Sequence, residues 1–251
     1  MTQLSDAELI ESFHISFLDV LSKRLESSRF VLKGGANLRF FFGSVRYSED
    51  IDLDLTGVKP ANLEEKVDRV LDSPALRALL RVRDLEVVNL SKPKQTETTR
   101  RWKLGIAAPG RSEPVRTKIE FSGRNGDDRF RLDPLPAEVV EPYALRPPIV
   151  QHYVENAPAE QKANALALRS ETQARDVFDL DMLLRRRPLP RGALDTETLA
   201  TAAELALQLP FAAFRDQVLP FLEPGVVELY DSESSWEQMQ TFVAEKLEQA
   251  Q

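Results

Sequence analysis

The sequence contains no cysteine and only two histidines, His14 and His152. Without cysteine the chain has no disulfide, no thiolate zinc site and no cysteine nucleophile, and two histidines are too few for a histidine-rich metal site. No apolar run approaches the roughly 18 residues that a membrane span needs. The first residues also lack a basic segment followed by an apolar one. We therefore expect no secretory signal, no membrane span and a cytoplasmic protein.

The net charge of −7 is unevenly distributed along the 251 residues. Residues 193–251 carry two basic and eleven acidic side chains, whereas residues 1–192 carry 31 basic and 29 acidic ones. Within the first part, residues 92–118 hold eight basic side chains against two acidic ones, around Trp102. Two interpretations of this stretch are open. It contacts a polyanion through its charges and by stacking on Trp102, or it forms exposed strands with Trp102 in the core.

Local patterns predict a mixed α/β half followed by a helical half. Ser5 and Glu8 form a capping box that predicts the first helix. Short helices are expected at 37–42 and 62–71, and strands at 30–32, 51–55, 85–90, 102–107 and 115–121. Residues 123–133 are interpreted as a loop, and residues 134–148, with five prolines, as a connector. Further helices are expected at 158–169, 175–187, 196–209, 211–218 and 234–248. We place the two domains at residues 1–140 and 141–251.

The most informative segment is residues 32–55. Gly34 and Gly35 directly precede an expected helix, and a glycine backbone at a helix N-terminus can approach a phosphate closely. Asp50 and Asp52 are two apart on an expected strand, so their carboxylates share a face and repel each other unless a cation lies between them. A Gly-Gly or an Asp-x-Asp alone is usually structural. Their occurrence in this order favours metal-assisted phosphoryl or nucleotidyl transfer.

These residues resemble the nucleotidyltransferase superfamily of DNA polymerase β type. More narrowly, the chain resembles the AbiEii-like toxins of type IV toxin–antitoxin systems, the group that includes the mycobacterial MenT enzymes. The segments that carry the resemblance are residues 33–35, 46–53, 162–169 and 174–180. The resemblance implies an α+β fold, with a polymerase β-like mixed-sheet nucleotidyltransferase domain followed by a helical C-terminal domain that contributes Lys162 and Asp176 to the site.

The resemblance also implies roles for individual residues. It implies five residues needed for catalysis: Asp50, Asp52, Glu120, Lys162 and Asp176. It implies a Mg²⁺ ion, or Mn²⁺ in its place, held by Asp50, Asp52 and Glu120. It implies nucleotide contacts from Lys33, Gly34, Gly35, Ser48 and Lys162. From the residues alone, the pattern around Lys162 favours a solvated lysine on a helix face, and only the resemblance gives it a role. Asp176 is equally well a carboxylate that complements a helix N-terminus. Glu120 is our first choice for the third carboxylate, and Asp176 the second.

One residue departs from the superfamily pattern. Ala36 stands where a serine or threonine follows the glycine pair, so one hydrogen bond to the triphosphate is missing, worth about 1.5–3 kcal/mol when charge-assisted. The replacement by Ala36 leaves three consequences open: weaker nucleotide binding, compensation by Asn37 or Ser44, or a different nucleotide donor.

The favoured expectation is an enzyme that transfers NMP from an NTP to the 3′ end of tRNA, releases pyrophosphate and thereby blocks translation. A cognate antitoxin is a further expected partner. Two alternatives remain: a nucleotidyltransferase with a protein or small-molecule acceptor, and a non-catalytic member that binds a nucleotide or a partner protein.

Overall fold

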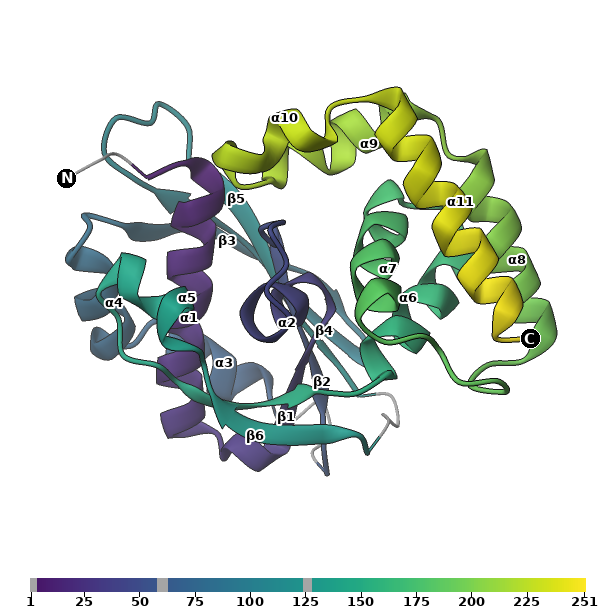
Figure 1. The fold of residues 1–251 in the computed structure, drawn as a ribbon. Coiled ribbons are helices and arrows are strands. Elements are labelled where there is room, and N and C mark those ends of the chain that lie inside the picture. Colours follow the sequence, from purple (N-terminus) through teal and green to yellow (C-terminus); the bar gives the residue numbers. More distant parts are fainter. Residues whose placement is uncertain (1–3, 58–62, 124–127) are drawn as a thin grey trace. The chain divides into compact units, whose positions relative to one another are not determined.

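The structure is a computed structural model that describes residues 4–57, 63–123 and 128–251 (Figure 1). The chain forms two compact units. The first unit contains the residues up to Gly43 and Tyr47–Tyr153, and the second contains Ser44–Arg46 and Val154–Gln251. The expected boundary after residue 140 lies inside the first unit, because residues 149–153 form a strand of its sheet.

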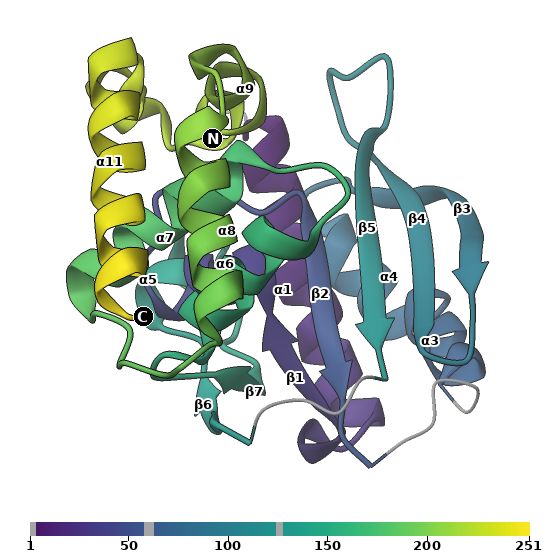
Figure 2. The same cartoon turned by 90° about the vertical axis from the view of Figure 1, so that its right-hand side faces the viewer.

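The described part of the first unit contains one seven-stranded mixed sheet in the order β3-β4-β5-β2-β1-β7-β6 (Figure 2). The strands are β1 (Phe30–Lys33), β2 (Asp50–Leu55), β3 (Glu86–Gln95), β4 (Thr99–Ala107), β5 (Val115–Ser122), β6 (Phe130–Pro134) and β7 (Ile149–Tyr153). β1 runs parallel to β7 and β2 parallel to β5, whereas all other neighbours are antiparallel. The glycine-rich turn and the Asp-x-Asp strand therefore lie near the centre of the sheet.

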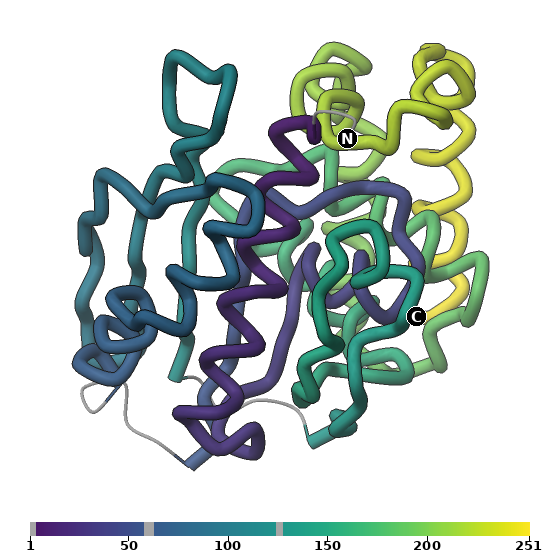
Figure 3. Tube along the Cα trace, turned by 90° about the vertical axis from the view of Figure 1, so that its left-hand side faces the viewer, coloured from purple at the N-terminus to yellow at the C-terminus, as the bar shows by residue number. Residues whose placement is uncertain are grey.

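Helices cover one face of this sheet. They are α1 (Asp6–Arg24), α3 (Glu64–Leu71) and α4 (Pro74–Arg81), and the unit also contains α2 (Gly34–Phe41), α5 (Ala137–Val140), η1 (Ser27–Arg29) and η3 (Glu141–Tyr143). α1 begins at the predicted capping box, since the Ser5 side chain accepts from the Glu8 backbone and Glu8 accepts from the Ser5 backbone. α1 then runs across the sheet (Figure 3).

The period of two in β2 decides which side chains meet these helices. Ile51, Leu53 and Leu55 are buried in one hydrophobic core with residues of α1, α3 and α4. Trp102 of β4 is fully buried in the same core and donates its indole N–H to Asp68 (2.9 Å). The stacking interpretation of Trp102 is therefore wrong, and the core interpretation is confirmed. The aspartates of β2 lie on the opposite face.

The second unit is helical. Its elements are α6 (Ala157–Leu168), α7 (Ala174–Arg186), α8 (Thr196–Gln208), α9 (Phe211–Gln217), η4 (Leu219–Phe221), η5 (Pro224–Val226), α10 (Val227–Tyr230) and α11 (Glu233–Gln249). α11 packs against α7 and α8, and the ring of Phe214 stacks on Trp236 with 4.7 Å between centroids. The inserted residues 44–46 are bonded to this unit through their backbone: Val45 O accepts from Glu223 N (2.9 Å), and Arg46 forms a β-bridge with Leu222.

The α+β class, with a mixed sheet followed by helices, is confirmed. Among the described residues, no helix combines the length and the apolar character needed to cross a membrane.

Candidate active site

The open face of β2 carries a row of three carboxylates. Asp50, Asp52 and Asp54 alternate with the core residues of this strand and so point to the same side. Glu120 of the parallel strand β5 is in register with Asp52. The sheet thus places the predicted third carboxylate directly beside the Asp-x-Asp pair.

Most of these carboxylates have a basic partner. Lys118 Nζ lies 2.8 Å from Asp50 Oδ2, and Arg101 Nε donates to Glu120 Oε2 at 2.6 Å. Asp54 forms an ion pair with Lys33 and accepts from the Tyr153 hydroxyl (2.9 Å). Among the described residues, no side chain forms an ion pair or hydrogen bond with Asp52. Asp52 is therefore the carboxylate of this row whose charge stays uncompensated.

The donor chemistry of this face suits a divalent cation. Asp50 and Asp52 offer adjacent carboxylate oxygens, which Mg²⁺ binds together with substrate phosphates. The described ranges contain no group of three or more acidic or histidine side chains arranged to hold a metal ion. Glu120 pairs with Arg101 and Asp50 pairs with Lys118, so a metal ion at either carboxylate would compete with a basic side chain. Asp50 and Asp52, two apart on one face of β2, are the part of the predicted metal site whose donor chemistry suits a divalent cation.

The glycine pair begins α2 immediately beside Asp52. Gly34 has a left-handed backbone (φ +67°), and a Cβ atom built on it would lie 3.1 Å from Asp52 Oδ2. Lys33, one residue earlier, is in register with Asp52 across the antiparallel pair. The backbone at a helix N-terminus and the uncompensated carboxylate therefore adjoin each other.

We expect Gly34→Ala to lower both stability and activity. The left-handed conformation costs a residue with a Cβ about 1–2 kcal/mol, and the new methyl group would push on the Asp52 carboxylate. Gly192→Ala is the matched control, because Gly192 has φ +74° but nothing within 4 Å of its added Cβ. Both variants should lose similar stability in urea unfolding, whereas only Gly34→Ala should lower the rate of nucleotide transfer. Equal rates in the two variants would contradict the assignment.

Two side-chain hydrogen bonds hold the backbone where β2 begins, and a third positions one of the two donors. Ser48 Oγ donates to Asp50 O (2.7 Å), and Thr117 Oγ1 donates to Glu49 O (2.7 Å). Since the Thr117 hydrogen is used on Glu49, the contact from His14 Nε2 to Thr117 Oγ1 (2.9 Å) requires His14 to be the donor. Burial lowers the pKa of His14 to about 3, so the ring is neutral at physiological pH. Ser48, predicted to bind nucleotide, here fixes the start of the Asp-x-Asp strand.

The hydroxyl that the superfamily pattern has at this position is missing at Ala36. Ala36 is buried in the hydrophobic core. Asn37 uses its Nδ2 on Tyr153 O (3.0 Å), and Ser44 Oγ accepts from the backbone of Arg46 (3.2 Å). The two side chains considered for compensation are thus engaged in internal hydrogen bonds.

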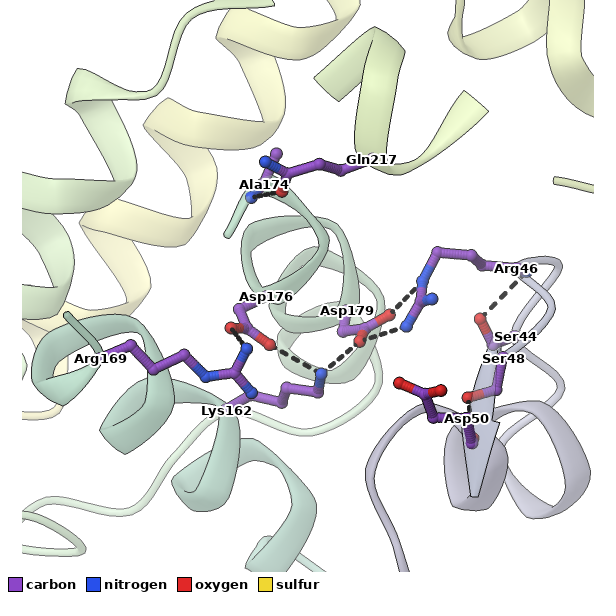
Figure 4. Close-up of polar contacts among 10 residues, drawn as sticks. All are labelled: Ser44, Arg46, Ser48, Asp50, Lys162, Arg169, Ala174, Asp176, Asp179 and Gln217. Atoms are coloured by element: carbon purple, nitrogen blue, oxygen red, sulfur yellow. Dashed lines mark hydrogen bonds and ion pairs between the residues drawn. The ribbon is translucent and has the colours of Figure 1, made fainter. Parts of the chain in front are cut away.

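The second unit contains a buried network of charges (Figure 4). Asp179 of α7 accepts from Arg46 through Nε (3.1 Å) and Nη2 (2.8 Å), which is a bidentate pair. Lys162 of α6 bridges two carboxylates, at 2.7 Å from Asp179 Oδ2 and 2.8 Å from Asp176 Oδ1. Arg169 approaches the other oxygen of Asp176 at 3.4 Å. The two aspartates have no exposed surface, so the cations are their source of compensation.

The charge of Asp179 is set by a balance. Burial acts to raise the pKa of this carboxyl, but the attraction of Arg46 and Lys162, together with their hydrogen bonds, outweighs burial and lowers the pKa to about 2. Asp179 is therefore ionised throughout the physiological range.

This pKa predicts a loss of stability in acid. In the unfolded state the Asp179 carboxyl has its ordinary pKa of 3.8, so as the pH falls below about 5 the unfolded state takes up a proton before the folded state does. The contribution of the Asp179 charge to the free energy of unfolding is complete above pH 5 and decreases as the pH falls toward 2. Its total is about 2 kcal/mol, because each unit of pKa difference corresponds to 1.36 kcal/mol. Urea unfolding at pH 5, 4 and 3, with Asp179→Asn as reference, measures it. A difference in unfolding free energy that does not change with pH would contradict this prediction.

The predicted site residues thus fall into two groups. Those of the first unit lie around Asp52: Lys33, Gly34, Gly35, Ser48, Asp50, Asp52 and Glu120. Lys162 and Asp176 belong to the charge network of the second unit, and that they serve the same reaction stays a prediction. The sequence-based prediction gave no role in the site to Arg46, Asp179, Arg101 or Lys118. For Asp179 a signal exists, since it lies three residues after Asp176 on one helix face.

Comparisons with known proteins agree on one family and one fold. The family described as nucleotidyl transferase AbiEii toxin, type IV TA system, matches residues 16–246. No curated protein matches the chain. MenT4, a nucleotidyltransferase toxin from Mycobacterium tuberculosis H37Rv, has a similar structure (TM-score 0.63, 19% identity), over 96% of this chain and 84% of that protein.

Two Helicobacter pylori structures are similar as well. JHP933 has a TM-score of 0.59 and 19% identity, over 99% of this chain and 96% of that protein. A protein described provisionally as a nucleotidyltransferase has a TM-score of 0.63 and 16% identity, over 98% and 96%. At these identities the likeness establishes the fold.

Proposed function

Because the chain belongs to the AbiEii family of nucleotidyl transferase toxins of type IV toxin–antitoxin systems, we propose that it transfers NMP from an NTP to the 3′ end of tRNA. The chain is a nucleotidyltransferase, as the members of this family are. A type IV system also implies an antitoxin partner. The tRNA acceptor, the metal ion and the cytoplasm as the place of action are the parts that we propose.

The observation that carries the proposal is the contact between Gly34 and Asp52. An added Cβ at Gly34 would lie 3.1 Å from Asp52 Oδ2, so the helix start that can bind phosphate and the uncompensated carboxylate lie together. A carboxylate without a cation repels a triphosphate. The start of α2 can therefore bind a triphosphate beside Asp52 only when a cation accompanies the nucleotide.

The proposed reaction is an in-line displacement. The oxygen of the acceptor hydroxyl forms a bond to the α-phosphorus, the bond from that phosphorus to the bridging oxygen of the β-phosphate breaks, and pyrophosphate leaves. The hydroxyl proton passes to a carboxylate. Glu120 is the best-placed group for this step, since it is partly exposed and in register with Asp52.

The aspartate pair, the glycine pair and Lys33 have binding roles in this scheme. Asp50 and Asp52 hold the divalent cation, Mg²⁺ or Mn²⁺, which supplies Lewis-acid stabilisation of charge on the α-phosphate when bound. The backbone N–H groups of Gly34 and Gly35 contact the triphosphate, whose charge the start of α2 favours. Lys33 is one residue away and adds positive charge beside the phosphates.

A label-transfer experiment tests the proposal. Each of the four α-³²P-labelled NTPs is incubated with Mg²⁺, total cellular RNA and the purified full chain, beside the Asp50→Ala/Asp52→Ala variant. We expect a labelled band at the size of tRNA with the protein and no band with the variant. Omission of the divalent cation should also abolish the label.

Other outcomes separate the alternatives. Label on protein or on small molecules would overturn the tRNA acceptor and keep the nucleotidyl transfer. Mg²⁺-dependent nucleotide binding without label on any acceptor would instead support a non-catalytic role.

A further inference from the structure

The basic residues of positions 92–118 separate onto the two faces of the sheet. Lys92 points to the helical face, where it pairs with Glu64 (2.9 Å) and also with Asp68. The cations of the open face are Lys94, Arg101, Lys103, Arg116 and Lys118. They come from β3, β4 and β5, which lie side by side with α3 and α4 behind them in Figure 2.

Three of the open-face cations lack an acidic partner. Lys118 is used on Asp50, and Arg101 on Glu120. Lys94, Lys103 and Arg116 are exposed and form no ion pair with any residue that the structure describes. We call these three residues the basic strip.

The register places like charges directly opposite each other. Lys103 of β4 lies opposite Lys118 of β5 in the strand register, and Lys94 of β3 lies opposite Arg101 of β4. Like charges at directly opposed positions on one face of a sheet destabilise it. Because Lys118 and Arg101 are each neutralised by a carboxylate, the excess positive charge of this face comes from Lys94, Lys103 and Arg116.

The basic strip is continuous with the carboxylate row. Asp50 is in register with Lys118, which is in register with Lys103, so one line of side chains crosses β2, β5 and β4. Neighbouring strands are about 4.8 Å apart, so Lys103 lies about 10 Å from Asp50 across the sheet. A ligand that reaches both must be extended and carry several negative charges.

We infer that the basic strip binds the phosphodiester backbone of the acceptor RNA next to its reacting 3′ end; this inference rests on the proposed function. Lysine and arginine contribute to such binding by neutralising phosphates, which releases counterions and requires no particular base. With Trp102 in the core, base stacking on that ring takes no part. The strip thus sets affinity for the acceptor, while Asp50 and Asp52 serve the reaction.

The test compares two triple variants with the same change in net charge. Lys94→Gln/Lys103→Gln/Arg116→Gln neutralises the strip. Arg24→Gln/Lys66→Gln/Arg81→Gln is the matched control, because these three exposed cations lie on α1, α3 and α4, the helices that cover the other face. Binding of a fluorescein-labelled 12-nucleotide RNA is measured by anisotropy between 50 and 300 mM salt, without NTP. Label transfer to RNA is measured separately.

We expect the strip variant to bind RNA about tenfold or more weakly than the unaltered protein. The slope of log affinity against log salt should decrease in magnitude by about 2, because each of the three lost phosphate contacts contributes about 0.7 on single-stranded RNA. In label transfer, KM for RNA should rise while kcat and KM for NTP stay within twofold. The control variant should match the unaltered protein in all of these. An equal loss in both variants, or no loss in the strip variant, would overturn the inference.

The two proposals can fail separately. Weakened RNA binding in the strip variant, with no label on any acceptor from the unaltered protein, supports the strip and contradicts the transfer reaction. Label on RNA with unaltered binding in the strip variant keeps the transfer reaction and removes the strip.

Discussion

Replacing Asp52 by asparagine should reduce nucleotide transfer by about 10³-fold, because it removes charge stabilisation worth several kcal/mol and each 1.36 kcal/mol is a factor of ten in rate. The substitution keeps the size of the side chain and changes only its charge. Since no described side chain pairs with Asp52, the variant should fold with unchanged stability. Steady-state label transfer and thermal unfolding measure the two expectations.

Two single substitutions with the same change in net charge as Asp52→Asn are the controls. Glu97→Gln and Glu113→Gln, made separately, each alter an exposed carboxylate of the same unit that has no partner among the described residues, and each should leave transfer within twofold. Asp50→Asn should lose activity as Asp52→Asn does. It also breaks the part-exposed ion pair with Lys118, which should lower the free energy of unfolding by about 0–1 kcal/mol. Transfer by Asp52→Asn at more than a tenth of the normal rate would mean that Asp52 has no part in binding the cation.

The second large effect concerns the stability of the helical unit. Arg46→Met should lower the free energy of unfolding by about 3–5 kcal/mol, since it leaves the fully buried Asp179 without its bidentate partner. Asp179→Leu should have an effect of similar size, because it removes the buried carboxylate that both Arg46 and Lys162 contact. Urea unfolding followed by circular dichroism measures both.

A double-mutant cycle tests whether the loss comes from the pair itself. Arg46→Met/Asp179→Leu removes both charges and should recover much of the stability lost by either single variant. Asp181→Asn on the same helix breaks the pair with Arg185, whose side chain is 54% exposed, and should cost about 0–1 kcal/mol. Additive losses in the cycle would show that Arg46 and Asp179 are not energetically coupled.

Sequence patterns predicted the elements that have local signals. The capping box of α1 and the alternation of β2 are examples, and α7 begins within a residue of its expected start. The loop expected at residues 123–133 is wrong for residues 130–133, which belong to β6, while residues 124–127 lie outside the described residues. The expected connector at 134–148 lies between β6 and β7, both of which belong to the sheet. β7 joins the sheet by pairing with β1, in which Val31 lies opposite Gln151. Residues so far apart in sequence leave no local pattern from which this pairing could be predicted.

In the candidate site too, features with a local sequence pattern could be predicted and features that depend on long-range strand pairing could not. The period of two places Asp50 and Asp52 on one face from the sequence alone. The ion pairs that compensate Asp50 and Glu120 depend on the order and register of β2, β5 and β4, which only the folded sheet defines. Likewise, the excess of basic residues at 92–118 was visible in the sequence. Which face each residue occupies follows from pairing that includes two register shifts in β3.

The insertion of residues 44–46 into the helical unit has a consequence for how the chain folds during synthesis. Arg46 and Asp179 are 133 residues apart, so at about 5–20 residues per second the carboxylate is made about 7 to 27 seconds after its partner. Over that interval the inserted residues have no helices to join. A fragment that starts at Val154 would contain every helix of the second unit but not the guanidinium that Asp179 requires. The helical unit is thus contiguous in space but not in the polypeptide, and it cannot be excised as a C-terminal piece.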